Sequence, residues 1–465
     1  MQESKEIKFG TDGWRGVISD NFTFKNVRKV AQAIADYYSA RAKSPKLAVG
    51  YDTRFLSKEY AQIVANVLSA NNIEVLLADN ATPTPMLSFK VKNHNQTAGV
   101  MITASHNPAD YNGIKIKTDT GGAAGVEITQ EVERMANAMI EVKTEPKARI
   151  IKEDFAKEYV NFLRSYINIK KLKTAKFKVL VDSMHGSGDK FITQVLKGSS
   201  IKVEFTRADI NPSFEGLRPE PVAENLEATM RKMKTEKFDI CLVLDGDADR
   251  IACVAPGGEF ISPQKILGLL ALHLNQDRKM SGGLVKTIVG SNMMDNISEK
   301  LGLKLYETPV GFKYISNLMD TKDILVGGEE AGGMGFKGYI PERDGSMAGL
   351  LLLEMMAFRK KNFLRILDEA ENEFGRYFYL RDDIRIPDIK VDYDALKKIK
   401  AVCNKEVVQV KDYDGVKLIL KDASWLMFRG SGTEPIMRVY AESKSLKITK
   451  ELLAFGRKLI LPDAL

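Results

Sequence analysis

The segment Asp245-Gly-Asp-Ala-Asp-Arg250 carries three carboxylates at alternate positions with small residues between them. Oxygen atoms spaced in this way can converge on one hard cation, and Mg²⁺ prefers oxygen ligands and leaves room for a phosphate oxygen. An EF-hand loop would need Gly at its sixth position and Glu at its twelfth, where this chain has Arg250 and Pro256. We therefore expect Asp245, Asp247 and Asp249 to bind a single Mg²⁺ beside an arginine suited to phosphate. The alternative is a solvated acidic turn.

The segment Thr103-Ala-Ser-His-Asn-Pro108 presents Ser105 directly after an apolar run that reads as a strand. A serine hydroxyl at such a strand end can carry a phosphoryl group covalently if it is activated. Lys115 lies ten residues further on and can return to the same site as a base or a charge partner. His106 is the only one of the four histidines that lies in such a loop. The alternative is a turn in which Ser and Asn bond locally.

Three further loops carry groups that suit a phosphorylated sugar. In Arg429-Gly-Ser-Gly-Thr-Glu-Pro435, backbone N–H groups and hydroxyls can form a phosphate cradle, with Arg438 nearby; a hairpin turn is the alternative. The acidic loop 327–333 includes Glu329, whose carboxylate can accept bonds from sugar hydroxyls; a flexible acidic loop is the alternative. In the segment 9–16, Arg15 can reach a phosphate, and Trp14 is expected to pack in the core.

The elements that must position these loops alternate between strand and helix, which is typical of a largely parallel sheet covered by helices. Apolar runs predict strands at 46–51, 73–78, 98–103, 178–182, 201–205, 239–244, 284–289, 304–307 and 323–326. Helical spacing predicts helices at 57–70, 224–236, 263–274 and 346–359. Ile114–Lys117 alternates apolar and basic residues, as a half-exposed strand would. We expect the catalytic loops at the carboxyl ends of these strands.

The last ninety or so residues differ from the rest. Strands are predicted at 417–420, 425–429 and 437–441, followed by a helix at 445–459, which suggests an α+β unit. A chain of 465 residues accommodates two to four domains at roughly 100–200 residues per domain.

Composition excludes several classes of protein. The net charge is +8, but no dense basic block occurs, so we expect no nucleic-acid partner. Three cysteines without paired spacing exclude a disulfide framework and a cysteine-based zinc ribbon. No apolar run is long enough for a membrane span, and the polar N-terminal segment Met1–Gly10 has no apolar stretch of the kind a secretory signal needs. We therefore expect a cytoplasmic protein without a membrane partner. The sequence contains no Gly-Lys dipeptide, which excludes a Walker A loop. The segment 333–338 matches the GxGxxG pattern, but Tyr-Ile-Pro follows it instead of a helix, which argues against a dinucleotide site.

Taken in order, these loops resemble the α-D-phosphohexomutase superfamily, and specifically its phosphoglucomutase/phosphomannomutase group. The matching segments are Gly10-Thr-Asp-Gly-Trp-Arg-Gly16, Thr103-Ala-Ser-His-Asn-Pro108, Asn112-Gly-Ile-Lys115, Asp245-Gly-Asp-Ala-Asp-Arg250, Gly328-Glu-Glu-Ala-Gly332 and Ser431-Gly-Thr-Glu-Pro435. The ordered set covers essentially the whole chain and is highly specific.

The resemblance implies an α/β fold of four domains arranged like a heart around a central cleft: 1–148, 149–255, 256–370 and a smaller α+β domain at 371–465. It implies a phosphoserine at Ser105, which together with Asp245, Asp247 and Asp249 would bind Mg²⁺. Lys115 would be the general base, with Arg15, His106 and Arg250 in the catalytic site. Substrate contacts would come from Gly311, Lys286, Glu329, Ala331, Arg429, Ser431, Gly432, Thr433 and Arg438.

The implied reaction interconverts hexose 1-phosphate and hexose 6-phosphate, through a hexose 1,6-bisphosphate such as glucose 1,6-bisphosphate. The chain would act on a small phosphosugar as a monomer or a weak homodimer. Ala331 stands where Ser is common in the family, and Glu330 in place of Gln favours glucose over glucosamine. Phosphoglucosamine mutase, a sugar phosphatase with Asp245 or Asp247 as nucleophile, and a non-catalytic sugar-phosphate sensor are the alternatives.

Overall fold

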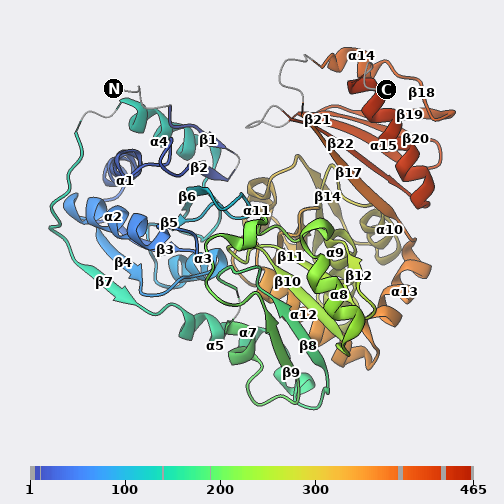
Figure 1. Ribbon diagram of the computed structural model, residues 1–465, viewed down its shortest axis with the longest axis horizontal. Helices are drawn as coiled ribbons and strands as arrows, with labels where there is room; N and C mark the ends of the chain where they lie inside the picture. Colours follow the sequence, from blue (N-terminus) through green and yellow to red (C-terminus); the bar gives the residue numbers. More distant parts are fainter. Residues whose placement is uncertain are drawn as a thin grey trace.

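Four sheets organise the molecule and are seen in Figure 1 as four units. The computed structural model describes residues 6–10, 12–138, 141–188, 190–385, 391–430 and 436–461. In each of the first three sheets, parallel strand pairs run to one edge and the pairing becomes antiparallel toward the other edge, whereas the fourth sheet is antiparallel throughout. The predicted architecture of three α/β units and a smaller α+β unit is confirmed.

The first sheet has seven strands. Their order is β1 (Phe9–Gly10), β2 (Gly13–Val17), β6 (Tyr111–Lys117), β5 (Ala98–Ile102), β3 (Lys46–Tyr51), β4 (Glu74–Ala78) and β7 (Ile150–Glu153). Its helices are α1 (Phe24–Ser39), α2 (Ser57–Ala70), α3 (Thr84–Asn93) and α4 (Val126–Ala138). Strand β7 pairs with β4, so this sheet extends past the domain boundary expected at residue 148.

The prediction that Ile114–Lys117 is a half-exposed strand is wrong. Strand β6 lies between β2 and β5, and both of its lysines are buried, Lys115 at 1% and Lys117 at 0% exposure. Lys117 forms an ion pair with Glu342, which is also fully buried and comes from the third domain. An alternation of apolar and basic residues indicates a half-exposed strand only where no carboxylates cover the basic face. Here carboxylates from the second and third domains cover the lysines of β6.

The second and third sheets also combine parallel and antiparallel strand pairs. The second has the order β12 (Glu259–Ile261), β11 (Ile251–Ala255), β10 (Ile240–Leu244), β8 (Lys178–Asp182) and β9 (Lys202–Thr206), with helices α5 (Ala156–Tyr166), α6 (Ile169–Leu172), α7 (Lys190–Val195) and α8 (Glu227–Thr235). The third has the order β14 (Leu305–Thr308), β13 (Gly283–Thr287), β15 (Ile324–Gly328) and β16 (Met334–Phe336), with helices α9 (Pro263–Leu272), α10 (Asn292–Leu301), α11 (Phe312–Thr321), α12 (Gly345–Arg359) and α13 (Phe363–Phe374). Strand β12 belongs to the second sheet although it lies past the boundary expected at residue 255.

The fourth sheet has six antiparallel strands. Their order is β17 (Phe378–Arg385), β22 (Ile436–Ser443), β21 (Trp425–Gly430), β20 (Val416–Leu420), β19 (Lys405–Lys411) and β18 (Ala401–Val402), with helices α14 (Tyr393–Lys397) and α15 (Leu446–Ile460). The predicted strands and C-terminal helix of this unit are confirmed.

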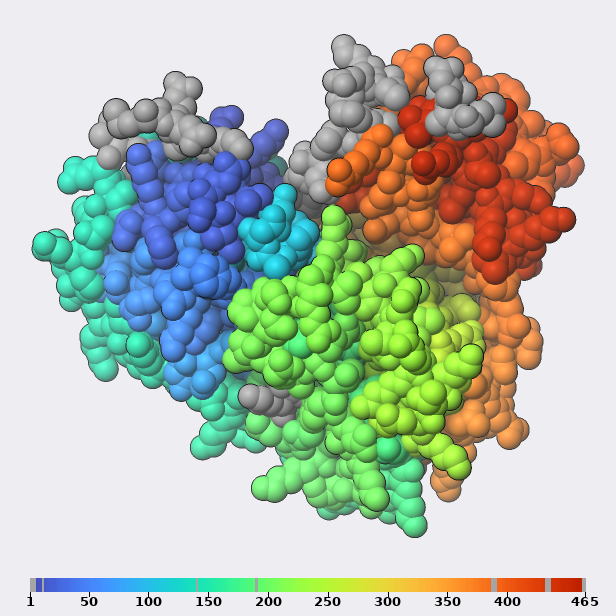
Figure 2. All heavy atoms as spheres, in the orientation of Figure 1, coloured from blue at the N-terminus to red at the C-terminus, as the bar shows by residue number. Residues whose placement is uncertain are grey.

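The apolar core shows which units are joined firmly. One cluster of buried apolar residues runs from Ile7 to Phe374 through the first three units, whereas the fourth has a core of its own, from Ile384 to Ile460. The smaller cluster Ile288, Val289, Trp425, Met427 and Tyr440 connects the fourth unit to the third. Figure 2 shows the hollow that separates the N-terminal unit (blue) from the C-terminal unit (red). Within the described residues, no helix is both long and apolar enough to span a membrane.

The buried pair Lys117–Glu342 gives a stability prediction. Lys117→Met leaves the Glu342 carboxylate buried without its cation, so we expect a loss of about 3–5 kcal/mol in the free energy of unfolding. Chemical denaturation measures it. Lys46→Met is the matched control, because Lys46 pairs with Glu74 on the surface and its loss should cost at most about 1 kcal/mol. Equal losses in the two variants would contradict this role of the buried pair.

Candidate active site

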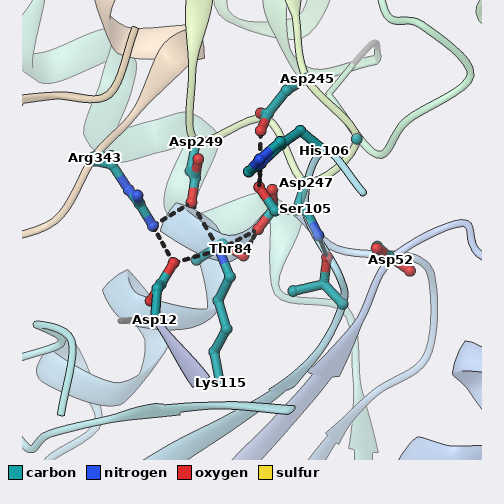
Figure 3. Close-up of polar contacts among 12 residues, drawn as sticks. Asp12, Asp52, Thr84, Ser105, His106, Lys115, Asp245, Asp247, Asp249 and Arg343 are labelled. Atoms are coloured by element: carbon teal, nitrogen blue, oxygen red, sulfur yellow. Dashed lines mark hydrogen bonds and ion pairs between the residues drawn. The ribbon is translucent and has the colours of Figure 1, made fainter. Parts of the chain in front are cut away.

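The three carboxylates of the loop after β10 lie together, as the sequence predicts. Asp245, Asp247 and Asp249 are fully buried, and each offers an oxygen within 4.8 Å of the others (Figure 3). Asp247 Oδ1 and Asp249 Oδ1 accept no hydrogen bond from any of the described residues. Buried oxygens without donors are costly unless a cation takes them, so these residues fit a Mg²⁺ ion.

Ser105 lies against this cluster at the carboxyl end of β5. Its Oγ donates a hydrogen bond to Asp245 Oδ2 at 3.0 Å, and its N–H donates to Thr103 Oγ1 at 2.8 Å. The serine has a φ of 53°, a conformation that costs free energy for a non-glycine residue and is found at functional sites. The loop Asp245–Arg250, here called the metal loop, approaches so closely that a side chain at Gly246 would come within 2.5 Å of the Ser105 carbonyl oxygen.

His106 is adjacent to the serine, with Nδ1 3.5 Å from Ser105 Oγ. Burial, together with the charges of Arg250, Arg15 and Lys115, holds the pKa of His106 well below its usual range. The imidazole is therefore neutral at physiological pH.

Arg54, which the sequence analysis missed, holds the serine loop in place. It is buried, and its two terminal nitrogens donate to the carbonyl oxygens of Ser105, Asn107, Pro108 and Tyr111 at 2.5–3.1 Å. Asp52 balances its charge, with an oxygen 3.4 Å from Arg54 Nε. Its position in the sequence could have indicated this role, because Arg54 is the third residue after β3 and β3 ends at the same sheet edge as the strand that precedes Ser105.

Lys115 reaches the metal loop from strand β6. Its Nζ lies 2.8 Å from Asp247 Oδ2, 2.9 Å from Asp249 Oδ2 and 3.0 Å from Asp12 Oδ2. Burial alone would lower the pKa of Lys115, but the three carboxylates raise it above its ordinary value. The lysine is thus a cation in this arrangement, which fits the role of charge partner.

Arg343, also missed, joins three domains at one guanidinium. Its Nη2 contacts Asp12 and lies 2.7 Å from Asp249 (Figure 3). Its Nη1 lies 3.4 Å from Glu329. It comes from the segment Pro341-Glu-Arg-Asp-Gly345, just before α12. Thr84, the first residue of α3, is another missed contact: its Oγ1 donates to Asp247 Oδ2 at 2.5 Å.

Arg250 and Arg15 lie at the rim of this cluster. The Arg250 N–H donates to Asp245 Oδ1 at 3.1 Å, and its Nε lies 3.8–3.9 Å from carboxylate oxygens of Asp249 and Asp245. Arg15 Nη1 donates to the side-chain oxygen of Asn107 at 2.6 Å, within the serine loop. Both cations therefore flank the serine where a phosphate on it would need neutralising.

The expected sugar loop follows β15. Glu329 is buried, and its N–H donates to the Gly333 carbonyl at 2.9 Å. Burial and the neighbouring Glu330 raise the pKa of Glu329 to about 7, although Arg343 and Arg250 oppose the shift. Ala331 lies in this loop, half-buried, and Gly311 directly precedes α11.

Two of the expected phosphate contacts of the fourth domain, Arg429 and Arg438, lie on adjacent strands. They face each other across β21 and β22. Ser431, Gly432 and Thr433 lie outside the described residues. Lys286 is buried at the junction of the third and fourth domains, where it pairs with Asp295 and lies 3.8 Å from Glu307. The structure therefore does not bring Lys286 to the metal loop.

Comparison with known proteins places these features in a family. The three α/β/α domains of phosphoglucomutase/phosphomannomutase match residues 6–143, 157–258 and 262–374, and the C-terminal domain of the same family matches residues 384–458.

Individual relatives match over the same length. A phosphoglucomutase/phosphomannomutase from Thermococcus kodakarensis is 30% identical over 97% of this chain and 98% of its own. A phosphoglucosamine/phosphogalactosamine mutase from Sulfurisphaera tokodaii is also 30% identical, over 97% and 98% of the two chains. The crystal structure described as a putative phosphomannomutase from Thermus thermophilus has a TM-score of 0.90 and 33% identity, covering 98% of this chain and 100% of that one. The chain therefore belongs to the phosphoglucomutase/phosphomannomutase family and is an enzyme, a phosphohexomutase.

Proposed function

We propose that this phosphohexomutase interconverts hexose 1-phosphate and hexose 6-phosphate through a phosphoserine at Ser105 and a hexose 1,6-bisphosphate intermediate, with glucose preferred and mannose as a second substrate. The observation that carries the proposal is the Ser105 hydroxyl, 3.0 Å from Asp245 and buried beside the three-carboxylate cluster. A phosphoryl group on this oxygen would meet the cations Arg250, Arg15 and Lys115.

The metal site and the charged residues have separate tasks. Asp245, Asp247 and Asp249 would hold Mg²⁺ together with the phosphate on Ser105, and the ion supplies charge stabilisation to the transferring phosphoryl group. Lys115 and Arg343 balance the carboxylates from two other domains. Arg250 and Arg15 neutralise the phosphate oxygens, and Lys115 is the group placed to take the substrate hydroxyl's proton once the charges around it change.

Two phosphate sites are needed, because the sugar intermediate carries two phosphates. The transferring phosphate would lie at Ser105, and the other would lie on the fourth domain between Arg429 and Arg438. Glu329 would accept hydrogen bonds from the sugar hydroxyls between them. The bisphosphate would then turn over in the hollow between the domains and return its other phosphate to Ser105.

Phosphoglucosamine mutase is the alternative within the same reaction class, since relatives with that activity in their names are about as similar. A sugar phosphatase would instead use Asp245 or Asp247 as the nucleophile. Asp247 Oδ2 is already engaged by Lys115 and Thr84, which favours a supporting role over a nucleophilic one. A sugar-phosphate sensor would bind without turnover, and the complete catalytic constellation argues against it.

The reaction itself is tested with glucose 1-phosphate, Mg²⁺ and a trace of glucose 1,6-bisphosphate. We expect glucose 6-phosphate as product, with a higher kcat/KM than for mannose or glucosamine 1-phosphate. Ser105→Ala should lower kcat at least about 1,000-fold, because the hydroxyl that carries the phosphoryl group is gone. Ser165→Ala is the control, since among the described residues its hydroxyl bonds only to the Phe162 carbonyl of its own helix. No product from any hexose 1-phosphate, or full activity of Ser105→Ala, would refute the proposal.

The metal role of Asp247 is tested by a Mg²⁺ titration. Asp247→Asn removes one ligand charge, so the Mg²⁺ concentration for half-maximal activity should rise on the order of 10- to 100-fold. Asp394→Asn changes an exposed carboxylate of the fourth domain and should leave the titration unchanged. Superimposable titrations for Asp247→Asn and the wild type would argue against this site.

The raised pKa of Glu329 predicts a pH dependence. Because this pKa is raised to about 7, the group is increasingly protonated as pH falls through 7, and a protonated carboxyl is a poorer acceptor for sugar hydroxyls. The KM for hexose phosphate should therefore rise as the pH is lowered through this pKa. In Glu329→Gln the KM should be higher and the pH dependence flatter. The same substrate is used for both proteins, so the phosphate's own titration near about pH 6 cancels. Identical pH profiles of KM would exclude this role.

A further inference from the structure

Asp414 contacts two elements that carry expected substrate residues, although no sequence motif singled it out. It lies in the turn between β19 and β20 of the fourth domain. Its two carboxylate oxygens lie 2.9 and 3.0 Å from Arg429 Nε. Its Oδ2 also accepts a hydrogen bond from the Val310 N–H of the third domain at 2.7 Å. Val310 directly precedes Gly311, so one carboxylate joins the proposed phosphate arginine to the loop before α11.

The turn is held against the third domain by other contacts. Lys411 Nζ and the Tyr413 hydroxyl both donate to Glu307 Oε1 at 2.6 Å. Gly415 has a φ of 95°, and a side chain there would come within 2.3 Å of the Phe428 carbonyl oxygen. The turn therefore packs tightly on β21, and this places Asp414 beside Arg429.

Asp414 binds the Nε edge of the Arg429 guanidinium. Within the described ranges, the hydrogen bonds of the Arg429 side chain all start at Nε. A carboxylate on that edge fixes the plane of the guanidinium and leaves its two terminal nitrogens for a phosphate. Arg429 also faces Arg438 across the sheet, and like charges directly opposite each other repel. Asp414 offsets this repulsion on the Arg429 side.

We propose that Asp414 is a positioning residue, which orients Arg429 for the phosphate that is not transferred and ties it to the Val310–Gly311 loop of the third domain. This inference rests on the proposed function, because Arg429 needs positioning only if a sugar phosphate binds there. Asp414 itself would not touch the substrate. Its effect would pass through Arg429, so it should alter substrate binding far more than the chemical step.

The test is a double-mutant cycle with Asp414→Asn and Arg429→Met, measured with glucose 1-phosphate as substrate and with glucose 1,6-bisphosphate binding by calorimetry. Asp414→Asn is nearly isosteric and keeps an oxygen for the Val310 N–H, but it loses the charge on Arg429. We expect its KM to rise about 10-fold with kcat within about twofold of the wild type. In the Arg429→Met background, Asp414→Asn should have no further effect.

Two variants of the same turn are controls. Tyr413→Phe removes a bond to Glu307 across the same domain junction but does not contact Arg429. Asp412→Asn removes an exposed carboxylate that pairs with Lys397. Both should keep the wild-type KM. Asp414→Glu, which restores the charge, should recover most of the lost affinity and provides a second variant if Asp414→Asn folds poorly.

Three results would overturn the inference. A wild-type KM for Asp414→Asn would show that Arg429 needs no positioning. Effects that multiply in the double mutant would show that Asp414 acts independently of Arg429, and an equal rise in KM for Tyr413→Phe would assign the effect to domain docking. A wild-type protein that neither converts hexose phosphates nor binds the bisphosphate would instead refute the proposed function, and the inference with it.

Discussion

The burial of three carboxylates in one loop is the constraint on which the rest of the structure depends. Asp245, Asp247 and Asp249 lie within 4.8 Å of one another and away from water. Burial, reinforced by Asp249 and Asp247, raises the pKa of Asp245 well above its usual range. Such a cluster stays charged only if cations surround it, and the second domain supplies only Arg250 among the contacts described above. Lys115 comes from the first domain and Arg343 from the third, so the metal loop is complete only when these three domains are packed together. Their continuous apolar core and the buried Lys117–Glu342 pair maintain that packing.

The sequence was sufficient for the elements and loops whose patterns are local. The carboxylate cluster, Ser105 at a strand end and most strand positions follow from spacing and apolar runs alone. The burial of Lys115 and Lys117 was not predictable in this way, because their alternating pattern is typical of an exposed strand and most of the carboxylates that pair with them come from other domains. Arg54 and Arg343 belong to no recognised motif: Arg54 binds carbonyl oxygens of its own domain, whereas Arg343 reaches carboxylates of two other domains. Helix α3 was also missed, because it is buried on nearly every side and lacks the two-faced pattern of a surface helix. Its first residue, Thr84, is nevertheless a contact of Asp247.

The fourth domain differs from the others in how it is held. It has a separate core and meets the third domain through a small apolar cluster and a few polar contacts, including those of Lys411, Tyr413 and Asp414. In the proposed reaction, one phosphate lies on the three-domain body and the other on this more loosely attached unit. Relative domain motion is expected at an interface of this kind and would let the same site accept the bisphosphate in both orientations.

Transfer of the phosphoryl group from Ser105 to the sugar is the central claim, and isotope labelling tests it most directly. The enzyme would be phosphorylated with ³²P-labelled glucose 1,6-bisphosphate, freed of ligand, mixed with unlabelled glucose 1-phosphate and quenched within the first turnover. The proposed mechanism predicts that the label leaves Ser105 and appears in glucose bisphosphate and glucose 6-phosphate, with little inorganic phosphate. Label that remains on the protein, was never on Ser105, or is released mainly as inorganic phosphate would contradict it.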